Sequence, residues 1–213
     1  MAPLNICLPA SIKHRYADLR GRAFIFPQDG VEAHVTLKAA QEEPLRNFTI
    51  CLRSFTNLIQ DCPLFSYASK DQYRDILIYK TYRNGYPEYN VWIGGEEVDF
   101  RVPDSFLGWK SSCITWESEM GVITLGIGNF VLARRVVQKG HCIGPPAVIM
   151  LGEVVWQTAD EVDFSGEIKD VYMWNATIPM RDLRRTSWDS LSPSPIINWR
   201  NLQYEIKGNV TLV

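Results

Sequence analysis

The acidic side chains best placed to bind a metal ion are concentrated in one short segment. Asp160, Glu161 and Asp163 lie almost next to one another in the chain. Clustered carboxylates in a loop are the ligands that a hard cation such as calcium requires, and such an ion takes about six to eight oxygen atoms. A polar turn that binds no ion would have the same composition, so both interpretations stay open.

Hydrolytic or metal-dependent catalysis needs several reactive side chains close together, and the histidines do not provide this. His14, His34 and His141 are far apart in the sequence, and none belongs to a His-Glu-x-x-His motif. The chain also lacks the Gly-x-Ser-x-Gly segment of a nucleophile elbow. We therefore expect structural roles for His34 and His141, and we expect that the protein is not an enzyme.

The charged residues do not indicate a nucleic-acid or membrane partner. With 22 basic and 24 acidic residues the formal net charge is −2, which produces no overall field that attracts polyanions. No apolar run approaches the roughly 18 residues of a membrane-spanning helix, so we expect no membrane insertion. Local basic groups are typical of solvated surfaces, although an anionic partner would also use them: Arg134, Arg135, Arg181, Arg184 and Arg185.

The cysteines and the glycosylation sequons are relevant to whether the chain is secreted. The five cysteines, at positions 7, 51, 62, 113 and 142, include no close pair of the kind found in zinc sites or dithiol redox motifs. An odd number leaves at least one thiol outside any internal disulfide, and the residues alone do not show which. Asn47, Asn175 and Asn209 begin Asn-x-Thr sequons, which are used only in a secreted chain. Residues 1–17, however, show neither the basic start nor the apolar stretch of a signal peptide.

The elements that must position these groups are short β-branched and aromatic runs separated by Gly, Pro, Asn and Asp, a pattern typical of strands joined by turns. Alternation is clearest at residues 48–55 and 121–128, where every second side chain is apolar and a half-buried strand is expected. A helix is expected at residues 178–188. The pattern predicts one all-β domain of two packed sheets with one helix on a face. The other expected strands are residues 23–26, 33–38, 75–79, 89–93, 98–102, 113–117, 147–151, 169–174 and 202–206.

A segment in the middle of the chain carries a recognisable signature. Cys113, Thr115, Trp116 and Ser118 form the pattern Cys-x-Ser/Thr-Trp-x-Ser, which resembles the signature of the pentraxin family, although Ser111 replaces the histidine that usually precedes it. Companion segments extend the resemblance to the short pentraxins over about residues 18–208. These segments are residues 24–27, 44–51, 64–67, 166–168, 172–174, 198–199 and 204–208.

The resemblance implies a fold and a disulfide. The fold would be an antiparallel two-sheet jelly-roll sandwich, similar to lectin and laminin-G domains, in a pentraxin domain of residues 18–213 that follows an unmatched segment 1–17. Cys51 and Cys113 match the intradomain disulfide of the family. The remaining cysteines would then be Cys7, Cys62 and Cys142.

The resemblance also implies a biological role. Pentraxins are secreted recognition proteins of innate immunity and the acute phase, and they assemble as cyclic homopentamers in which weak sites gain avidity. The expected ligands are phosphocholine-like head groups or glycans. Asn47 matches a position that carries a glycan in a member of the family.

The calcium site of the family is where this sequence departs from the pattern. Its first ligand pair aligns with Tyr73 and Arg74, and its second run aligns with Val154, Val155 and Trp156. These side chains do not coordinate calcium, and Arg74 adds a positive charge where cations would bind. Calcium is thus the cofactor that the family implies, but most matching ligands are absent. The remaining oxygen ligands would need a rearranged loop to hold an ion: Asp75, Glu153, Asp160, Glu161 and Asp163.

An aromatic pocket beside the metal position is retained. Tyr79 and Trp92 match aromatic ligand-contacting positions of the family, and Glu97 matches the acidic residue that meets a quaternary ammonium group. Two aromatic rings and a carboxylate can hold a cationic head group, although the same residues would also serve only to complete strand packing. We therefore expect a pentraxin-type recognition protein with a degraded calcium site, and the alternative is a metal-independent adhesive or structural module.

Overall fold

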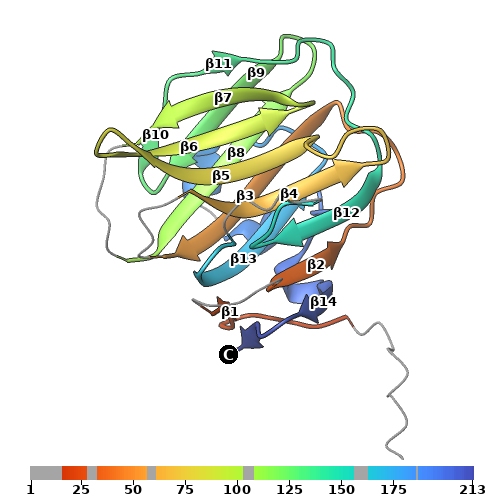
Figure 1. Cartoon of the computed structure of the whole chain (residues 1–213). Helices are drawn as coiled ribbons and strands as arrows, with labels where there is room; N and C mark the ends of the chain where they lie inside the picture. The colour runs from red at the N-terminus through yellow and green to blue at the C-terminus, as the bar shows by residue number, and fades with distance from the viewer. Residues whose placement is uncertain (1–15, 28–32, 57–60, 103–107, 156–162, 186) are drawn as a thin grey trace, which may run out of the picture.

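A computed structural model shows two antiparallel sheets that lie face to face, with one short helix and two 3-10 turns (Figure 1). This confirms the predicted two-sheet sandwich. Within the described part of the chain, no helix has the length and apolar character that a membrane span requires. The structure describes residues 16–27, 33–56, 61–102, 108–155, 163–185 and 187–213.

The first sheet, which we call the helix-side sheet, is built around the central strands β8 and β3. A further strand, β11 (Arg135–Val136), also pairs with β9. The order across the sheet is β10 (Phe130–Val131), β9 (Val122–Ile127), β8 (Lys110–Glu117), β3 (Asn47–Phe55), β13 (Gly166–Trp174), β1 (Phe24–Phe26) and β15 (Thr211–Leu212).

The second sheet, which we call the opposite sheet, ends in the consecutive hairpin strands β5, β6 and β7. Its outer face carries the residues of the predicted ligand pocket. The order across the sheet is β14 (Gln203–Lys207), β2 (His34–Lys38), β12 (Pro146–Leu151), β4 (Cys62–Ser69), β5 (Ile76–Arg83), β6 (Tyr86–Ile93) and β7 (Glu96–Arg101).

The hydrophobic core fills the space between the two sheets. Side chains of the longer strands point inward at alternate positions, as the period of two requires. Leu125 of β9 and Ile50 of β3 come from one sheet, and Ile78 and Val91 come from the other. Trp116 of the signature is fully buried in this core. Burying each such side chain contributes about 1.5–3 kcal/mol, so the apolar alternation seen in the sequence is the main source of stability.

The outer face of the helix-side sheet is covered by the C-terminal part of the chain. The covering elements are α1 (Met180–Arg185), η1 (Trp188–Ser190) and η2 (Trp199–Asn201). The indole Nε1 of Trp188 donates a hydrogen bond of 2.8 Å to the carbonyl of Leu183, which ties η1 to the helix. The expected helix at residues 178–188 is therefore confirmed in place, but the α-helix covers only residues 180–185. Because of this cover β3 is buried on both faces rather than half-buried.

The predicted disulfide is present. Cys51 of β3 and Cys113 of β8 are directly opposite each other in register, with Cα atoms 4.1 Å apart and their sulfur atoms bonded. The bond closes a segment of 62 residues. In the chain-entropy model, closing a loop of this length stabilises the fold by about 4 kcal/mol.

Candidate functional site

The outer face of the opposite sheet carries the predicted ligand residues. Leu77 and Tyr79 alternate along β5 and point outward, because the residues between them lie in the core. The register pairs Leu77 with Trp92, Tyr79 with Asn90, and Trp92 with Glu97. Three adjacent strands therefore bring Tyr79, Trp92 and Glu97, the residues that the resemblance singled out, to one patch.

The two aromatic rings are in direct contact. Tyr79 and Trp92 pack edge to face, with ring centroids 5.9 Å apart and an interplanar angle of 71°. Leu77, Tyr79 and Val154 form a small hydrophobic cluster separate from the main core, and Trp92 packs against it. The indole is only partly buried, whereas Leu77, Tyr79 and Val154 are buried, so Trp92 is the accessible member of this cluster.

Glu97 is held in position beside this cluster. Its carboxylate accepts a hydrogen bond from the side-chain amide of Asn90, and the amide oxygen of Asn90 accepts one of 2.6 Å from the hydroxyl of Thr81. Asn90 and Thr81 are both buried, whereas Glu97 is exposed. The buried amide and hydroxyl fix the carboxylate and leave its remaining acceptor capacity toward solvent.

Arg74 lies against the same aromatic residues. Its guanidinium carbon is 5.8 Å from the ring centroid of Trp92 and 5.4 Å from that of Tyr73, distances at which a cation is attracted to an aromatic face. The protein's own cation therefore covers part of the indole surface. A positive charge at this position follows from the sequence, but its contact with Trp92 does not.

Two of the candidate metal ligands are engaged with histidines. The carboxylate of Asp75 is buried, with one oxygen 3.1 Å from His141 Nε2 and the other accepting a hydrogen bond of 3.3 Å from the backbone N–H of Gly144. The carboxylate of Glu153 lies within hydrogen-bonding distance of Nδ1 of His34. The two histidines thus have structural partners, and the two carboxylates do not converge on a common point.

The other metal candidates do not complete a site. Asp163 is partly buried, whereas Asp160 and Glu161 lie outside the described residues. In the described part of the chain, no three His, Cys, Asp or Glu side chains come together as a metal site. Val154 and Val155 are buried, and the backbone N–H of Val155 donates to the hydroxyl of Ser66. At these two aligned positions the described chain therefore offers no side-chain oxygen to a calcium ion.

The remaining cysteines and the first sequon differ in accessibility. Cys62 is buried with a free thiol, and desolvation raises its pKa to about 12; Cys142 is exposed with a free thiol, and Cys7 lies outside the described residues. Asn47 is exposed at the start of β3. The third residue of its sequon, Thr49, is buried and hydrogen-bonded.

Comparison with known sequences identifies the relatives of this chain. The sequence model described as the Pentaxin family matches residues 22–213. Serum amyloid P-component of Bos taurus is 35% identical over 198 residues, which cover 91% of this chain and 87% of the relative. Mucosal pentraxin of Bos taurus is also 35% identical, covering 92% and 88%. C-reactive protein of Sus scrofa is 34% identical over 219 residues, covering 99% and 96%.

Comparison with solved structures agrees on the fold. A heptameric pentraxin from Limulus polyphemus, described as similar to serum amyloid P component, superposes with a TM-score of 0.80 over 92% of this chain and 96% of its own, at 18% identity. Proteins such as serum amyloid P component and C-reactive protein are recognition proteins rather than enzymes, in agreement with the expectation from the isolated histidines. From the sequence match, the fold and the disulfide together, the chain belongs to the pentaxin family, also written pentraxin.

Proposed function

We propose that this chain is a secreted pattern-recognition protein of innate immunity that binds zwitterionic, phosphocholine-like head groups without calcium. The observation that carries the proposal is the placement of Arg74 over Trp92, next to Glu97 on the neighbouring strand. A positive and a negative group thus flank one partly exposed indole. The phosphate of a head group would pair with Arg74, and its ammonium group would meet Glu97 and the edge of Tyr79.

We infer the loss of calcium dependence from the contacts that the candidate calcium-binding side chains make. Calcium is the cofactor that the family implies, but Asp75 and Glu153 are each paired with a histidine. Placing a dication beside the guanidinium of Arg74 would also be electrostatically unfavourable. We infer that Arg74 supplies the positive charge that the family obtains from metal ions.

Secretion and assembly belong to the same proposal. A disulfide between Cys51 and Cys113 forms and persists in an oxidising compartment, and Asn47 is exposed and available to carry a glycan. We expect a cyclic homo-oligomer, a pentamer by the resemblance, although the Limulus relative is heptameric. Cyclic symmetry presents every copy of the ligand face on the same side of the ring, so that weak sites gain avidity.

The test is retention of the secreted protein on phosphocholine resin with calcium or with a chelator, together with calorimetric titration of phosphocholine. Binding should be equal under both conditions. Arg74→Gln should weaken it by about tenfold, because a charge-assisted contact is worth at least about 1.4 kcal/mol. The control is Arg83→Gln, which changes an exposed arginine at the end of β5. Binding that requires calcium, or that Arg74→Gln leaves unchanged, would refute the proposal.

A metal-independent adhesive module is the second candidate function. It is favoured by the same cation–π contact, because Arg74 covers indole surface that a ligand cation would otherwise use. In that case the oligomer would bind cells or matrix in the presence of a chelator, and free phosphocholine would not compete. Competition by free phosphocholine would favour the first function.

A further inference from the structure

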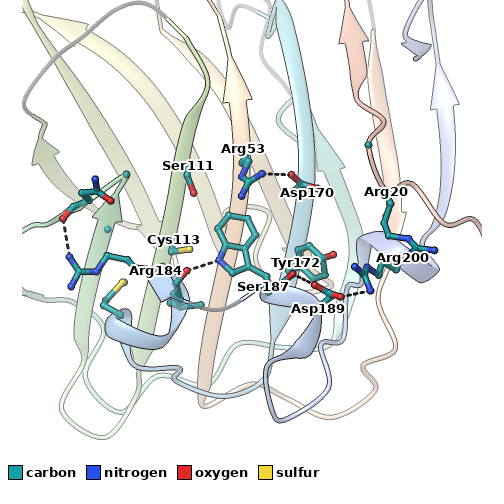
Figure 2. Close-up of a pocket in the computed structure, with 17 residues that line it drawn as sticks. Arg20, Arg53, Ser111, Cys113, Asp170, Tyr172, Arg184, Ser187, Asp189 and Arg200 are labelled. Carbon is teal, nitrogen blue, oxygen red and sulfur yellow. Dashed lines mark hydrogen bonds and ion pairs between the residues drawn. The ribbon is translucent and has the colours of Figure 1, made fainter.

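A concave site lies on the opposite side of the sandwich from the proposed ligand face. It is a cavity of about 340 Å³ between the α1 and η1 segment and the outer face of the helix-side sheet (Figure 2). Pockets that bind small molecules begin at about 300 Å³. The labelled side chains in Figure 2 come from the sheet, from the helix segment and from the region near Arg20 and Arg200. The pocket is therefore large enough for a compact ligand.

The pocket is open because the sheet beneath it carries small residues. In β9, Leu125 and Ile127 point into the core, which turns Gly126 outward to the floor of the pocket. A Cβ atom on Gly126 would lie only 3.0 Å from the sulfur of Met180. Cys113, whose sulfur is already in the disulfide, is a neighbouring residue of the floor. The missing side chain at position 126 thus leaves space under the helix.

Arg53 reaches the pocket from the sheet in a fixed position. Its Nη1 donates a hydrogen bond of 3.0 Å to Asp170, and its guanidinium carbon is 5.3 Å from the ring centroid of Trp188. Asp170 has a left-handed backbone with φ of 52°, at an irregularity in the pairing of β13 with β3. Such bulges redirect a side chain, and here the carboxylate holds Arg53 on the pocket wall.

Arg184 reaches the pocket from the helix. Its Nη1 donates a hydrogen bond of 2.9 Å to the backbone carbonyl of Asn129. Within the described chain its hydrogen-bond partner is thus a carbonyl and not a carboxylate. The positive charge of Arg184 is therefore not neutralised by an ion pair there.

The other charged groups of the pocket neutralise one another. Arg200 forms an ion pair with Asp189, and a hydrogen bond from Ser187, with a contribution from Arg200, lowers the pKa of Asp189. Arg20 pairs with Asp18. Four arginines and two aspartates line the cavity. Because Asp18, outside the lining, also pairs with Arg20, the net excess is one positive charge, and it belongs to Arg184.

We propose that this pocket binds a compact organic anion, with carboxylate or phosphate-ester oxygens held by Arg184 and Arg53 and an apolar body against Met180, Leu183 and Trp188. Arginine forms two parallel hydrogen bonds to such oxyanions. The ligand class differs from that of the opposite face, where a zwitterion is expected.

The test uses three probes that share one ring and differ in charge: benzoate, phenyl phosphate and benzyl alcohol. Titration of the oligomeric protein by NMR or calorimetry should show binding of one or both anions and much weaker binding of the alcohol. The comparison of benzoate with phenyl phosphate decides whether carboxylates or phosphate esters are preferred. Failure of both anions to bind at millimolar concentration, or equal binding of benzyl alcohol, would overturn the proposal.

Two variants localise the binding. Arg184→Gln should weaken the preferred anion by about tenfold or more, whereas Arg185→Gln, on the same turn but outside the pocket lining, should bind like the unmodified protein. Gly126→Leu should fill the cavity and abolish binding while phosphocholine retention on the other face is unchanged. Equal effects of the two arginine variants would show that only general surface charge attracts the anion, which contradicts a pocket.

Discussion

The guanidinium of Arg74 lies over the indole of Trp92, with 5.8 Å between the guanidinium carbon and the ring centroid. Trp92 is paired with Glu97 across β6 and β7, so the indole has a cation over its ring and a carboxylate on the neighbouring strand. On the proposed function, we expect this arrangement to favour a dipolar group over a simple cation. Removing Arg74 should therefore change whether the site prefers a zwitterionic or a cationic ligand, which can be measured.

Arg74→Ala should convert the site from a preference for phosphocholine to a preference for choline. Removing the guanidinium uncovers the indole, and a cation–π contact is worth about 0.5–1 kcal/mol at an exposed site, so choline should bind a few-fold more tightly. Phosphocholine should bind more weakly because its phosphate loses a partner. Calorimetric titrations of both ligands check this. The double variant Arg74→Ala/Trp92→Leu should lose the gain in choline affinity, and persistence of the gain would show that Trp92 is not the contact.

Thr49→Val should destabilise the fold although Thr49 belongs to a sequon. The hydroxyl of Thr49 donates to the carbonyl of Ala176 at 2.7 Å and accepts from the backbone N–H of Ile178 at 2.9 Å. Valine has the same shape but leaves both backbone groups without this partner, at a cost of about 1–3 kcal/mol for each buried group. Urea unfolding measures the loss. Asn47→Gln removes the same sequon but keeps the two hydrogen bonds of Thr49. A similar loss of stability in that variant would therefore trace the effect to the glycan.

The two free thiols should react at very different rates. Burial raises the pKa of the Cys62 thiol to about 12, and the thiolate is the reactive form. Iodoacetamide at pH 8 should therefore modify the exposed Cys142 within the folded protein and leave Cys62 unmodified, as peptide mass spectrometry would show. In urea both should react. Rapid modification of Cys62 under native conditions would mean that β4 opens frequently.

The family resemblance singled out Tyr79, Trp92 and Glu97, and strand geometry explains why they lie together. Tyr79, Trp92 and Glu97 occupy outward positions of three consecutive strands, and a period of two places such residues on one face. The strand β4 shows the limit of this rule. All of its residues, Cys62–Ser69, are buried on both faces, so the alternation disappears and only the family resemblance indicates the strand.

Contacts between distant segments could not be predicted from periodicity. The pairs Asp75–His141 and His34–Glu153 join residues 66 and 119 positions apart, and nothing local in the sequence couples them. One residue in the sequence is a partial indication of the helix-side pocket, because Gly126 interrupts the outward-facing side chains of β9. What covers the resulting gap depends on the packing of α1, which the sequence pattern does not specify.

The stability of the protein should fall at alkaline pH, in part because of Tyr172. Desolvation, followed by the nearby charges of Asp189 and Asp170, raises the pKa of Tyr172 from 10.0 to about 12. Because the pKa of Tyr172 is higher in the folded state than in the unfolded state, its neutral hydroxyl contributes fully to stability below pH 10. This contribution is lost as the pH rises from 10 toward 12. The free energy of unfolding should decrease by about 1–2 kcal/mol over this window. This is less than the free energy that a shift of two full pKa units represents, because the phenol borders a pocket and solvent screens its charge.

Tyr172→Phe separates this effect from other alkaline effects. Phenylalanine keeps the ring contacts with Trp174 and Trp188, whose centroids lie 5.8 and 6.0 Å away, but it has no proton to lose. Urea unfolding at a series of pH values should give curves for the two proteins with a constant difference below pH 10. Above it, the unmodified protein should lose stability faster, because its unfolded state releases a proton that its folded state retains. Parallel curves up to pH 12 would mean that Tyr172 ionises equally easily in both states and is not desolvated by the fold.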